Sequence, residues 1–470
     1  MLRRTKIVAT IGPASREPEV LVRMVDAGLD VARLNFSHGS AEEHAETAER
    51  VRDASGRAGR QVAILQDLPG PKLRIGMLRE DVVELKPGDL VTFTCGGDDP
   101  GTGDAAHMHI AWAGLASAVT VDEVLYLADG AVRLRAVAVR PDEFDAQVEI
   151  GGAVASRQGV NLPGEVTDLP SVPEEDLAHL VTGERIGVDL VALSFVRRAE
   201  EITELRQHTR LPLIAKIEKP QAVERIEEIV HAADCVMVAR GDLGIELRIE
   251  EVPLVQKRVI ACAGSMARPV ITATQMLDSM VASSRPTRAE VADVANAILD
   301  GTDAVMLSQE TAVGAYPVET IEMMASIAVR AESIAPYDQW NEHRVTRDRR
   351  DPAYTVAFMA CRAADELGLD ALVVPTLSGR SARLISAHRP TVPIYALSPG
   401  RETVRRCALM WGVQAGSLPR YNVTEELIAA AAHRVVELGW VESGARVGIT
   451  AGLPSGRPGT TSLFQIQEVR

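Results

Sequence analysis

Short runs of apolar residues recur along the first three-quarters of the chain, and most of them end in polar residues. Eight of these runs have the length and the β-branched content of buried strands, and segments with apolar residues at helical spacing separate most of them. Strands that alternate with helices in this way predict a parallel sheet. The predicted strands are Thr5–Ile11, Val31–Phe36, Val62–Gln66, Leu190–Phe195, Leu213–Ile217, Cys235–Ala239, Val270–Ala273 and Ala304–Leu307.

The polar residues at the strand ends are of the kinds that bind phosphate groups or metal ions. Lys216 and Glu218 lie at the end of one strand, Asp242 follows the next strand, and Thr274 follows the one after that. In a (β/α)8 barrel all strand ends and the loops after them share one face, where the active site lies. The sequence therefore predicts an enzyme built on an α/β fold, a TIM barrel, with its site on that face.

Two segments depart from the strand–helix alternation. From 70 to 170 apolar residues alternate with polar ones, and Gly, Asp and Pro turns recur, which predicts a small all-β domain. We interpret it as a β-barrel lid that splits the main barrel into residues 1–69 and 171–337. The polar stretch 338–351 predicts a linker, and the alternation resumes over 352–470 as a separate C-terminal α/β domain.

Composition narrows the class of protein. A chain of 470 residues is too long for one hydrophobic core. A net charge of −15 argues against a nucleic-acid or membrane partner, although a local basic pocket is still allowed. The five cysteines have no paired zinc spacing, and no apolar run is long enough to span a membrane. These features predict a protein of the cytoplasm.

The residues at the strand ends favour phosphoryl chemistry. Lys216 and Glu218 point to the same side of one strand, because side chains alternate with period two. With Asp242, Glu218 offers two hard oxygen ligands, which suit Mg2+ or Mn2+ completed by water and substrate. The backbone near Gly241 leaves N–H groups for an anion, and Arg33 and Lys216 add positive charge for a phosphoryl group in transfer. Each motif alone also fits a structural ion pair or turn, but together they favour a catalytic site.

Longer motifs resemble the pyruvate kinase family, in its bacterial form, over essentially the whole chain. They are Thr5–Pro13, Ala32–Gly39, Ile214–Lys219, Met237–Gly244, Ala273–Leu277 and the long run from Pro286 through Ala312. The resemblance implies phosphoryl transfer from phosphoenolpyruvate to ADP, giving pyruvate and ATP through a metal-stabilised pyruvate enolate. It also implies a homotetramer.

The resemblance gives a role to each residue of the predicted site. Glu218 and Asp242 would bind the divalent ion, Mg2+ or Mn2+. The substrate would be bound by Arg33, Lys216, Gly241, Asp242 and Thr274. Catalysis would depend on Arg33, Lys216, Thr274, Ser308 and Glu310, the last three in the network that protonates the enolate. The nucleotide would contact Thr10, Pro13, Asn35, His38, Arg74 and Arg198, although His38 also fits a solvated loop residue.

One departure from the family pattern concerns monovalent cations. Relatives that require K+ read Asp-Thr-Lys-Gly-Pro-Glu after the third strand, whereas this chain has Leu68 at the threonine position and Lys72 at the glutamate position. Asn35, Ser37 and Asp67 would then remain as a vestigial monovalent site. The ammonium of Lys72 would supply the missing positive charge, so we expect catalysis without K+. A second departure, Gln309 in place of a glycine, has no predicted consequence.

A loop in the C-terminal domain is the candidate effector site. It follows a strand and opens a helix, a geometry that exposes N–H donors to an anion. In pyruvate kinases the matching loop holds the phosphate of an activating sugar phosphate or nucleotide such as AMP, whereas an ordinary helix cap is the alternative. Its residues are Thr376, Ser378, Gly379, Arg380 and Ser381.

Two other functions share part of this pattern. A lyase or aldolase that uses a metal-stabilised pyruvate enolate could carry the same pair of carboxylates, but it would need neither the lid nor ADP. A binding protein without catalysis is the other alternative, and the intact set Lys216, Glu218, Asp242 and Thr274 argues against it. An assay for ADP-dependent formation of pyruvate separates these functions.

Overall fold

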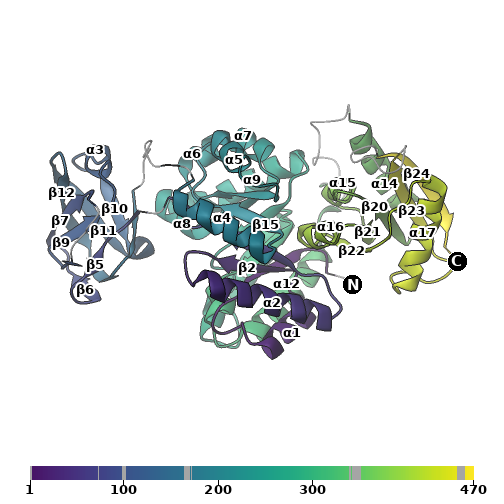
Figure 1. Ribbon diagram of the computed structural model, residues 1–470, viewed down its shortest axis with the longest axis horizontal. Helices are drawn as coiled ribbons and strands as arrows, with labels where there is room; N and C mark the ends of the chain where they lie inside the picture. The colour runs from purple at the N-terminus through teal and green to yellow at the C-terminus, as the bar shows by residue number, and fades with distance from the viewer. Residues whose placement is uncertain are drawn as a thin grey trace.

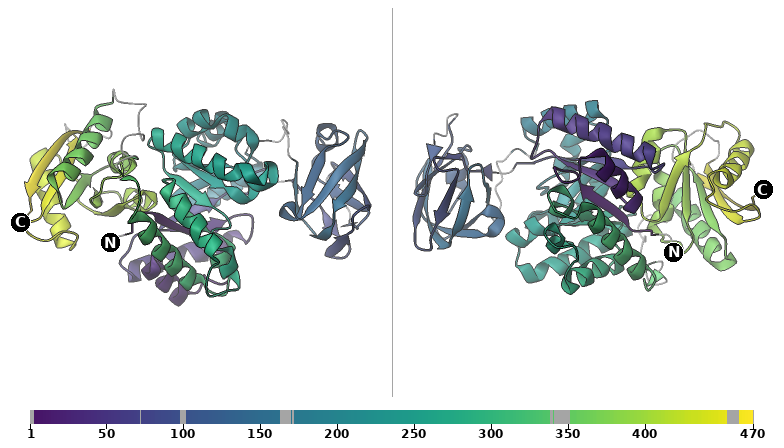
Figure 2. Two further views of the ribbon diagram at one scale, coloured as in Figure 1. Left: turned by 180° about the vertical axis from the view of Figure 1, so that it is seen from behind. Right: turned by 90° about the horizontal axis from the view of Figure 1, so that it is seen from below.

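The computed structural model describes residues 3–71, 73–97, 102–162, 170, 172–337, 340, 351–452 and 461–469. Lys72 and most of the predicted linker 338–351 lie outside the described residues. The chain forms three parts in a row, with the strand–helix barrel between an all-β part and a C-terminal α/β part (Figures 1 and 2). The predicted limits of these domains stay a prediction.

The central part is a closed barrel of eight parallel strands, which confirms the predicted TIM-barrel fold. β1 pairs with both β2 and β19, so the ring closes. Every predicted strand is present, and the bounds differ by at most two residues at either end. In chain order the barrel strands are β1 (Lys6–Thr10), β2 (Val31–Asn35), β3 (Ala63–Asp67), β15 (Leu190–Leu193), β16 (Leu213–Ile217), β17 (Cys235–Ala239), β18 (Val270–Ala273) and β19 (Ala304–Leu307).

Helices surround the barrel and cover its apolar strands. Two of them begin with a capping box, in which Ser40 and Thr287 each exchange hydrogen bonds with the glutamate three residues later. The barrel helices are α1 (Pro18–Ala27), α2 (Ala41–Arg57), α4 (Glu174–Ile186), α5 (Ala199–Leu205), α6 (Pro220–Glu224), α7 (Ile226–Ala232), α8 (Arg240–Glu246), α9 (Val252–Ser265), α10 (Arg288–Leu299), α11 (Gln309–Ala312) and α12 (Pro317–Glu332).

The barrel interior is packed with side chains and is not a pore. Val8, Leu65, Ile214 and Met237 belong to this inner cluster, each fully buried. The cluster also includes Ala408 and Leu409 from the C-terminal part, which therefore contacts the barrel interior. Lys6, at the start of β1, donates a hydrogen bond to the carbonyl of Val413 over 2.7 Å, so this contact lies at the N-terminal end of the strands. The opposite, C-terminal end carries the candidate site.

The inserted part is built almost entirely of strands, as predicted. Its main sheet has the order β4-β14-β10-β11-β12-β7-β9, and two ribbons, β13-β6 and β5-β8, complete it. Phe93 and Phe144 stack in its core with ring centroids 5.0 Å apart. The elements are β4 (Leu73–Arg74), β5 (Met77–Leu78), β6 (Val82–Leu85), β7 (Leu90–Cys95), β8 (Thr102–Gly103), β9 (His107–Ile110), α3 (Leu115–Ala118), β10 (Val124–Leu127), β11 (Val132–Val139), β12 (Glu143–Ile150), β13 (Gly152–Ala155) and β14 (Gly159–Asn161).

The C-terminal part has a five-stranded sheet in the order β22-β21-β20-β23-β24, parallel except for β24. This confirms the predicted α/β domain. Its elements are α14 (Pro352–Leu367), β20 (Ala371–Pro375), α15 (Arg380–Ala387), β21 (Ile394–Ser398), α16 (Arg401–Arg406), β22 (Val413–Ser417), α17 (Thr424–Glu437), β23 (Arg446–Gly452) and β24 (Thr461–Glu468). Within the described ranges, no helix is both long enough and apolar enough to cross a membrane.

Candidate active site

Lys216, near the end of β16, is the centre of a charge network at the C-terminal end of the barrel. Its ammonium lies 2.9 Å from Glu218 Oε1 and 3.4 Å from Asp67 Oδ1, and it donates to Ser194 Oγ over 2.8 Å. The Lys216 side chain is only 11% exposed. Burial disfavours the ammonium, but Asp67 and Glu218 outweigh it and raise the pKa of Lys216 above its usual value. The amine therefore stays charged throughout the physiological pH range.

Arg33, on β2, shares Asp67 with Lys216. Its Nε and Nη2 lie 2.7 and 2.6 Å from Asp67 Oδ2, and Nη1 donates to Thr10 Oγ1 over 2.9 Å. Burial alone would raise the pKa of Asp67, but Lys216 and Arg33 lower it below its usual value. Arg33 and Lys216 thus lie side by side at the strand ends, each paired with Asp67, and both offer positive charge to an anionic substrate.

Glu218 is the most enclosed carboxylate of the site. It is fully buried, and its Oε2 accepts a 2.6 Å hydrogen bond from the backbone N–H of Phe195. Burial raises the pKa of Glu218 to about 7; the charge of Lys216 opposes this shift and that of Asp242 adds to it. Glu218 and Asp242 are neighbouring carboxylates that repel one another, and such a pair suits a divalent cation. The described residues contain no group of three or more His, Cys, Asp and Glu side chains with metal-site geometry, so other ligands would come from substrate and water.

Thr274 lies in a strained turn after β18. Thr274 and Gln275 have φ of 70° and 54°, a region that non-glycine residues rarely adopt. Thr274 Oγ1 accepts a 2.7 Å hydrogen bond from the N–H of Gly241, so the two predicted substrate-binding residues are in contact. Arg240 holds the turn by donating to the carbonyl of Thr274 over 2.8 Å, and Asp293 pairs with Arg240 at 2.7 Å.

Ser308 and Glu310 lie at the end of β19, next to this turn. Glu310 is buried, and its two oxygens accept hydrogen bonds from the N–H groups of Leu277 and Ser308, over 3.2 and 2.6 Å. Glu310 therefore connects the loop after β18 with the loop after β19. Both oxygens of the Glu310 carboxylate bind backbone N–H groups, so Glu310 positions these two loops.

The predicted nucleotide residues are more dispersed. Thr10 is buried beside Arg33, whereas Pro13 and His38 are exposed. Arg198 lies 3.7 Å from Glu201, and Arg74 donates to the carbonyl of Arg157 over 3.2 Å. Arg198 and Arg74 thus contact residues outside the Lys216 network, whereas Thr10 joins it through Arg33.

A cavity of about 320 Å3 lies between the barrel and the inserted sheet. Arg74 lines it, and so do Phe36 and Ser37 after β2, Trp112 after β9 and Glu175 on α4. Its volume lies within the range of small-molecule sites. Of the predicted nucleotide residues, Arg74 alone is among the lining residues of this cavity.

The predicted monovalent site keeps only part of its oxygen ligands. Leu68 is fully buried and brings no side-chain oxygen, and Asn35 Oδ1 accepts a 3.3 Å hydrogen bond from the N–H of Ser37. Asp67, the third member, is already paired with Arg33 and Lys216. The role predicted for Lys72 falls on a residue outside the described ranges.

The effector loop opens α15 as predicted. Gly379 has φ of 83°, and its N–H donates to Thr376 Oγ1 over 3.0 Å. Ser381 and Thr461, on β24, hydrogen-bond through their hydroxyls at 2.5 Å. The Arg380 side chain instead pairs with Asp351.

Two residues that hold the site were not predicted. Ser194 is the hydrogen-bond partner of Lys216, and Arg240 supports the strained turn. Ser194 lies near the end of the predicted strand Leu190–Phe195 and Arg240 follows the predicted strand Cys235–Ala239, but their partners are 22 and 34 residues away. Only the closed barrel brings these partners together.

A buried lysine lies among carboxylates on the barrel, with an arginine beside it. This arrangement of charges suits a TIM-barrel enzyme that transfers phosphoryl groups. The comparisons with known proteins agree. Family models described as "Pyruvate kinase, barrel domain" and "Pyruvate kinase, alpha/beta domain" match residues 2–321 and 354–467. The chain belongs to the pyruvate kinase family.

Similar proteins match over their full length or most of it. A pyruvate kinase of Geobacillus stearothermophilus is 42% identical over 477 residues, covering 100% of this chain and 81% of the relative. One of Agrobacterium vitis is 42% identical over 468 residues, covering 99% and 98%. A crystal structure of a pyruvate kinase from Cryptosporidium parvum has a TM-score of 0.92 at 32% identity, covering 100% and 96%. The chain is thus an enzyme that transfers a phosphoryl group from phosphoenolpyruvate to ADP.

Proposed function

We propose that this transfer takes place at the C-terminal end of the barrel and leaves a pyruvate enolate that the site protonates. The observation that carries the proposal is the position of Lys216, held between Asp67, Glu218 and Ser194 with its charge retained. The bond from phosphorus to the enol oxygen breaks, and a bond to a terminal phosphate oxygen of ADP forms. Lys216 and Arg33 stabilise the negative charge that develops on the phosphoryl and enolate oxygens.

Pyruvate kinases generally use Mg2+ and K+. We propose that Glu218 and Asp242 would hold Mg2+ or Mn2+, because both are carboxylates and Glu218 is buried at the end of β16. Bound there, the cation would polarise substrate oxygens as a Lewis acid. Gly241 and Thr274, which lie in contact, would bind the substrate carboxylate, and Arg240 keeps this turn in place.

The enolate step has a direct test. The network of Thr274, Ser308 and Glu310 protonates the enolate carbon in this proposal, so by reversibility it also removes a methyl proton from pyruvate. We expect the enzyme with Mg2+ and inorganic phosphate to exchange the methyl protons of pyruvate in D2O, followed by NMR. Thr274→Ala should slow this exchange about 100-fold.

The exposed Thr203→Ala on α5 is the matched control and should leave the exchange unchanged. No exchange by the wild-type enzyme would contradict the enolate, and normal exchange by Thr274→Ala would remove Thr274 from the protonating network.

We propose further that catalysis does not require K+. Asp67 is occupied by Arg33 and Lys216, and Leu68 offers no oxygen, so a cation would find few free ligands and would be repelled by the neighbouring charges. Turnover in tetramethylammonium buffer should change by less than about twofold when KCl is added at matched ionic strength. Lys72→Glu should create a requirement for K+. Strong activation of the wild type by K+ would contradict the proposal.

The remaining assignments follow the family pattern. We propose that the nucleotide contacts Thr10, Pro13, Asn35, His38, Arg74 and Arg198, and that Thr376–Ser381 binds an activating phosphate such as that of a sugar phosphate or AMP. The position of this loop at the N-terminus of α15, where the first N–H groups have no partner within the helix, supports the second assignment. A homotetramer and a cytoplasmic location stay predictions.

A further inference from the structure

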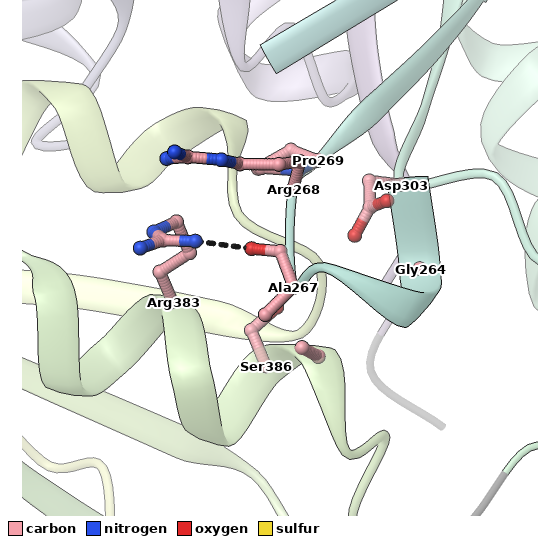
Figure 3. Close-up of a pocket in the computed structure, with 8 residues that line it drawn as sticks. Gly264, Ala267, Arg268, Pro269, Asp303, Arg383 and Ser386 are labelled. Carbon is pink, nitrogen blue, oxygen red and sulfur yellow. Dashed lines mark hydrogen bonds between the residues drawn. The ribbon is translucent and has the colours of Figure 1, made fainter. Parts of the chain in front are cut away.

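Three arginine side chains meet where the barrel packs against the C-terminal domain, far from the candidate active site. Arg268 lies in the loop between α9 and β18, and Arg380 and Arg383 lie on α15. A cavity of about 390 Å3 opens beside this arginine cluster, and His231 also lines it. Figure 3, a close-up of an adjoining pocket, shows the side chains of Arg268 and Arg383, one from each domain, and the hydrogen bond from Arg383 to Ala267.

Carboxylates balance only part of this positive charge. Arg380 is paired with Asp351, and its side chain stays 36% exposed. Asp234 lies 3.8 Å from Arg268 but is held more closely by Arg206, at 2.7 Å. Among the residues that the structure describes, four arginines therefore share two carboxylates, which leaves two positive charges there in a chain whose net charge is −15.

Arg383 is the cation of the cluster without a carboxylate partner among the described residues. Its Nη1 donates to the backbone carbonyl of Ala267, which ties α15 to the barrel. Asp303, which lines the neighbouring part of the junction, is already bound by Arg389 at 2.9 Å. Burial, together with the charges of Arg268 and Arg380, lowers the pKa of Arg383 to about 10. The Arg383 guanidinium thus has a backbone carbonyl as its partner but no balancing negative charge among the described residues.

We propose that the arginine cluster binds the phosphoryl group of a phosphate monoester, at a second anion site between the barrel and the C-terminal domain. The planar guanidinium fork matches phosphate oxygens, and a phosphate monoester carries about two negative charges near neutral pH. The cavity has room for a small sugar or nucleoside attached to that phosphate. Because Arg268 belongs to one domain and Arg380 and Arg383 to the other, the occupant contacts both and stabilises their junction.

This site is separate from the proposed effector loop. Thr376, Ser378 and Ser381 do not line the cavity, and the hydroxyl of Ser381 is bonded to Thr461 on β24. Of the residues assigned to the effector loop, Arg380 alone lines the cavity, where it pairs with Asp351. Variants of Ser381 and of Arg268 therefore affect different sites.

The test is isothermal titration calorimetry of the full chain with inorganic phosphate, ribose 5-phosphate and AMP in separate titrations. At least one monoester should bind more tightly than inorganic phosphate. Arg268→Gln and Arg383→Gln should each raise the dissociation constant of that monoester by at least about tenfold, because each removes a charged donor from the phosphate.

Two further variants show whether the monoester binds at the arginine cluster or at the effector loop. Ser381→Asp places a negative charge in the effector loop and should leave binding at the arginine cluster unchanged. Arg362→Gln, which removes a half-exposed arginine on α14, is the matched control for net charge. Circular dichroism checks the fold, and Arg383→Lys, which keeps the charge but loses the planar guanidinium, replaces Arg383→Gln if the latter does not fold.

Unchanged affinity in both Arg268→Gln and the second variant would overturn the proposal, and so would loss of all monoester binding in Ser381→Asp. Equal affinity for inorganic phosphate and both monoesters would show an unselective anion site and would also overturn it.

Discussion

Lys216→Met should lower kcat by about 100- to 1,000-fold, the size of effect expected when one preorganised charged donor is removed from a transition state. Methionine keeps the length and apolar body of the side chain but removes the ammonium that lies between Asp67, Glu218 and Ser194. The charge that Lys216 stabilises is greatest while the phosphoryl group moves. The KM for phosphoenolpyruvate should therefore change much less than kcat.

Steady-state kinetics with phosphoenolpyruvate, ADP and Mg2+ measures this effect. Lys257→Met is the matched control, because its side chain is 57% exposed and pairs with Asp300 on the outside of the barrel. The substitution of Lys216 also leaves Asp67 and Glu218 with less positive charge, so assays are run well below the unfolding midpoint of each variant. A variant that keeps kcat and loses only affinity for phosphoenolpyruvate would contradict the role given to Lys216.

Glu218→Gln and Asp242→Asn should each lower turnover at least about 100-fold, because a neutral amide binds a divalent cation poorly and the Lewis-acid contribution is lost. Both substitutions keep the size of the side chain. In Glu218→Gln the new amide oxygen can still accept the hydrogen bond from the N–H of Phe195, so the local backbone keeps its partner. A loss of turnover in these variants would therefore result from the missing carboxylate charge and not from a change in side-chain shape.

Binding of Mn2+, followed by electron paramagnetic resonance of the free ion, gives a readout that does not depend on turnover. The affinity should fall in both variants. Glu246→Gln is the matched control, since Glu246 is buried nearby but paired with Lys219 at 2.6 Å. Wild-type affinity for Mn2+ in Glu218→Gln and Asp242→Asn would show that the cation binds elsewhere.

The barrel could be predicted because its strands are apolar on both faces, which produces short continuous runs such as Cys235–Ala239. Two strands of the C-terminal sheet, β22 and β24, were not predicted. β22 is short, carries Gly416 and has exposed residues, and β24 is an edge strand with several exposed positions, so neither shows a buried run. Alternation indicated the all-β part but could not give its pairing, such as the parallel contact of β7 with β9.

The same limit applies to the site. Lys216 and Glu218 were visible because they are two positions apart at the end of one strand, which places them on one side. The contact of Arg240 with the turn at Thr274, and the approach of Arg383 to Ala267, join segments 34 and 116 residues apart. No local pattern encodes such contacts, because they depend on how the barrel closes and how the last domain packs against it.

Phosphorus NMR of phosphoenolpyruvate and ADP mixed with the enzyme tests most directly whether the strand-end site carries the transfer. With Mg2+, the wild-type enzyme should convert phosphoenolpyruvate and ADP to ATP, and addition of EDTA should stop the conversion. Lys216→Met at the same concentration should form ATP about 100-fold more slowly or worse. ATP formation by Lys216→Met at the wild-type rate would contradict the account, because the transfer would then take place without the residue at its centre.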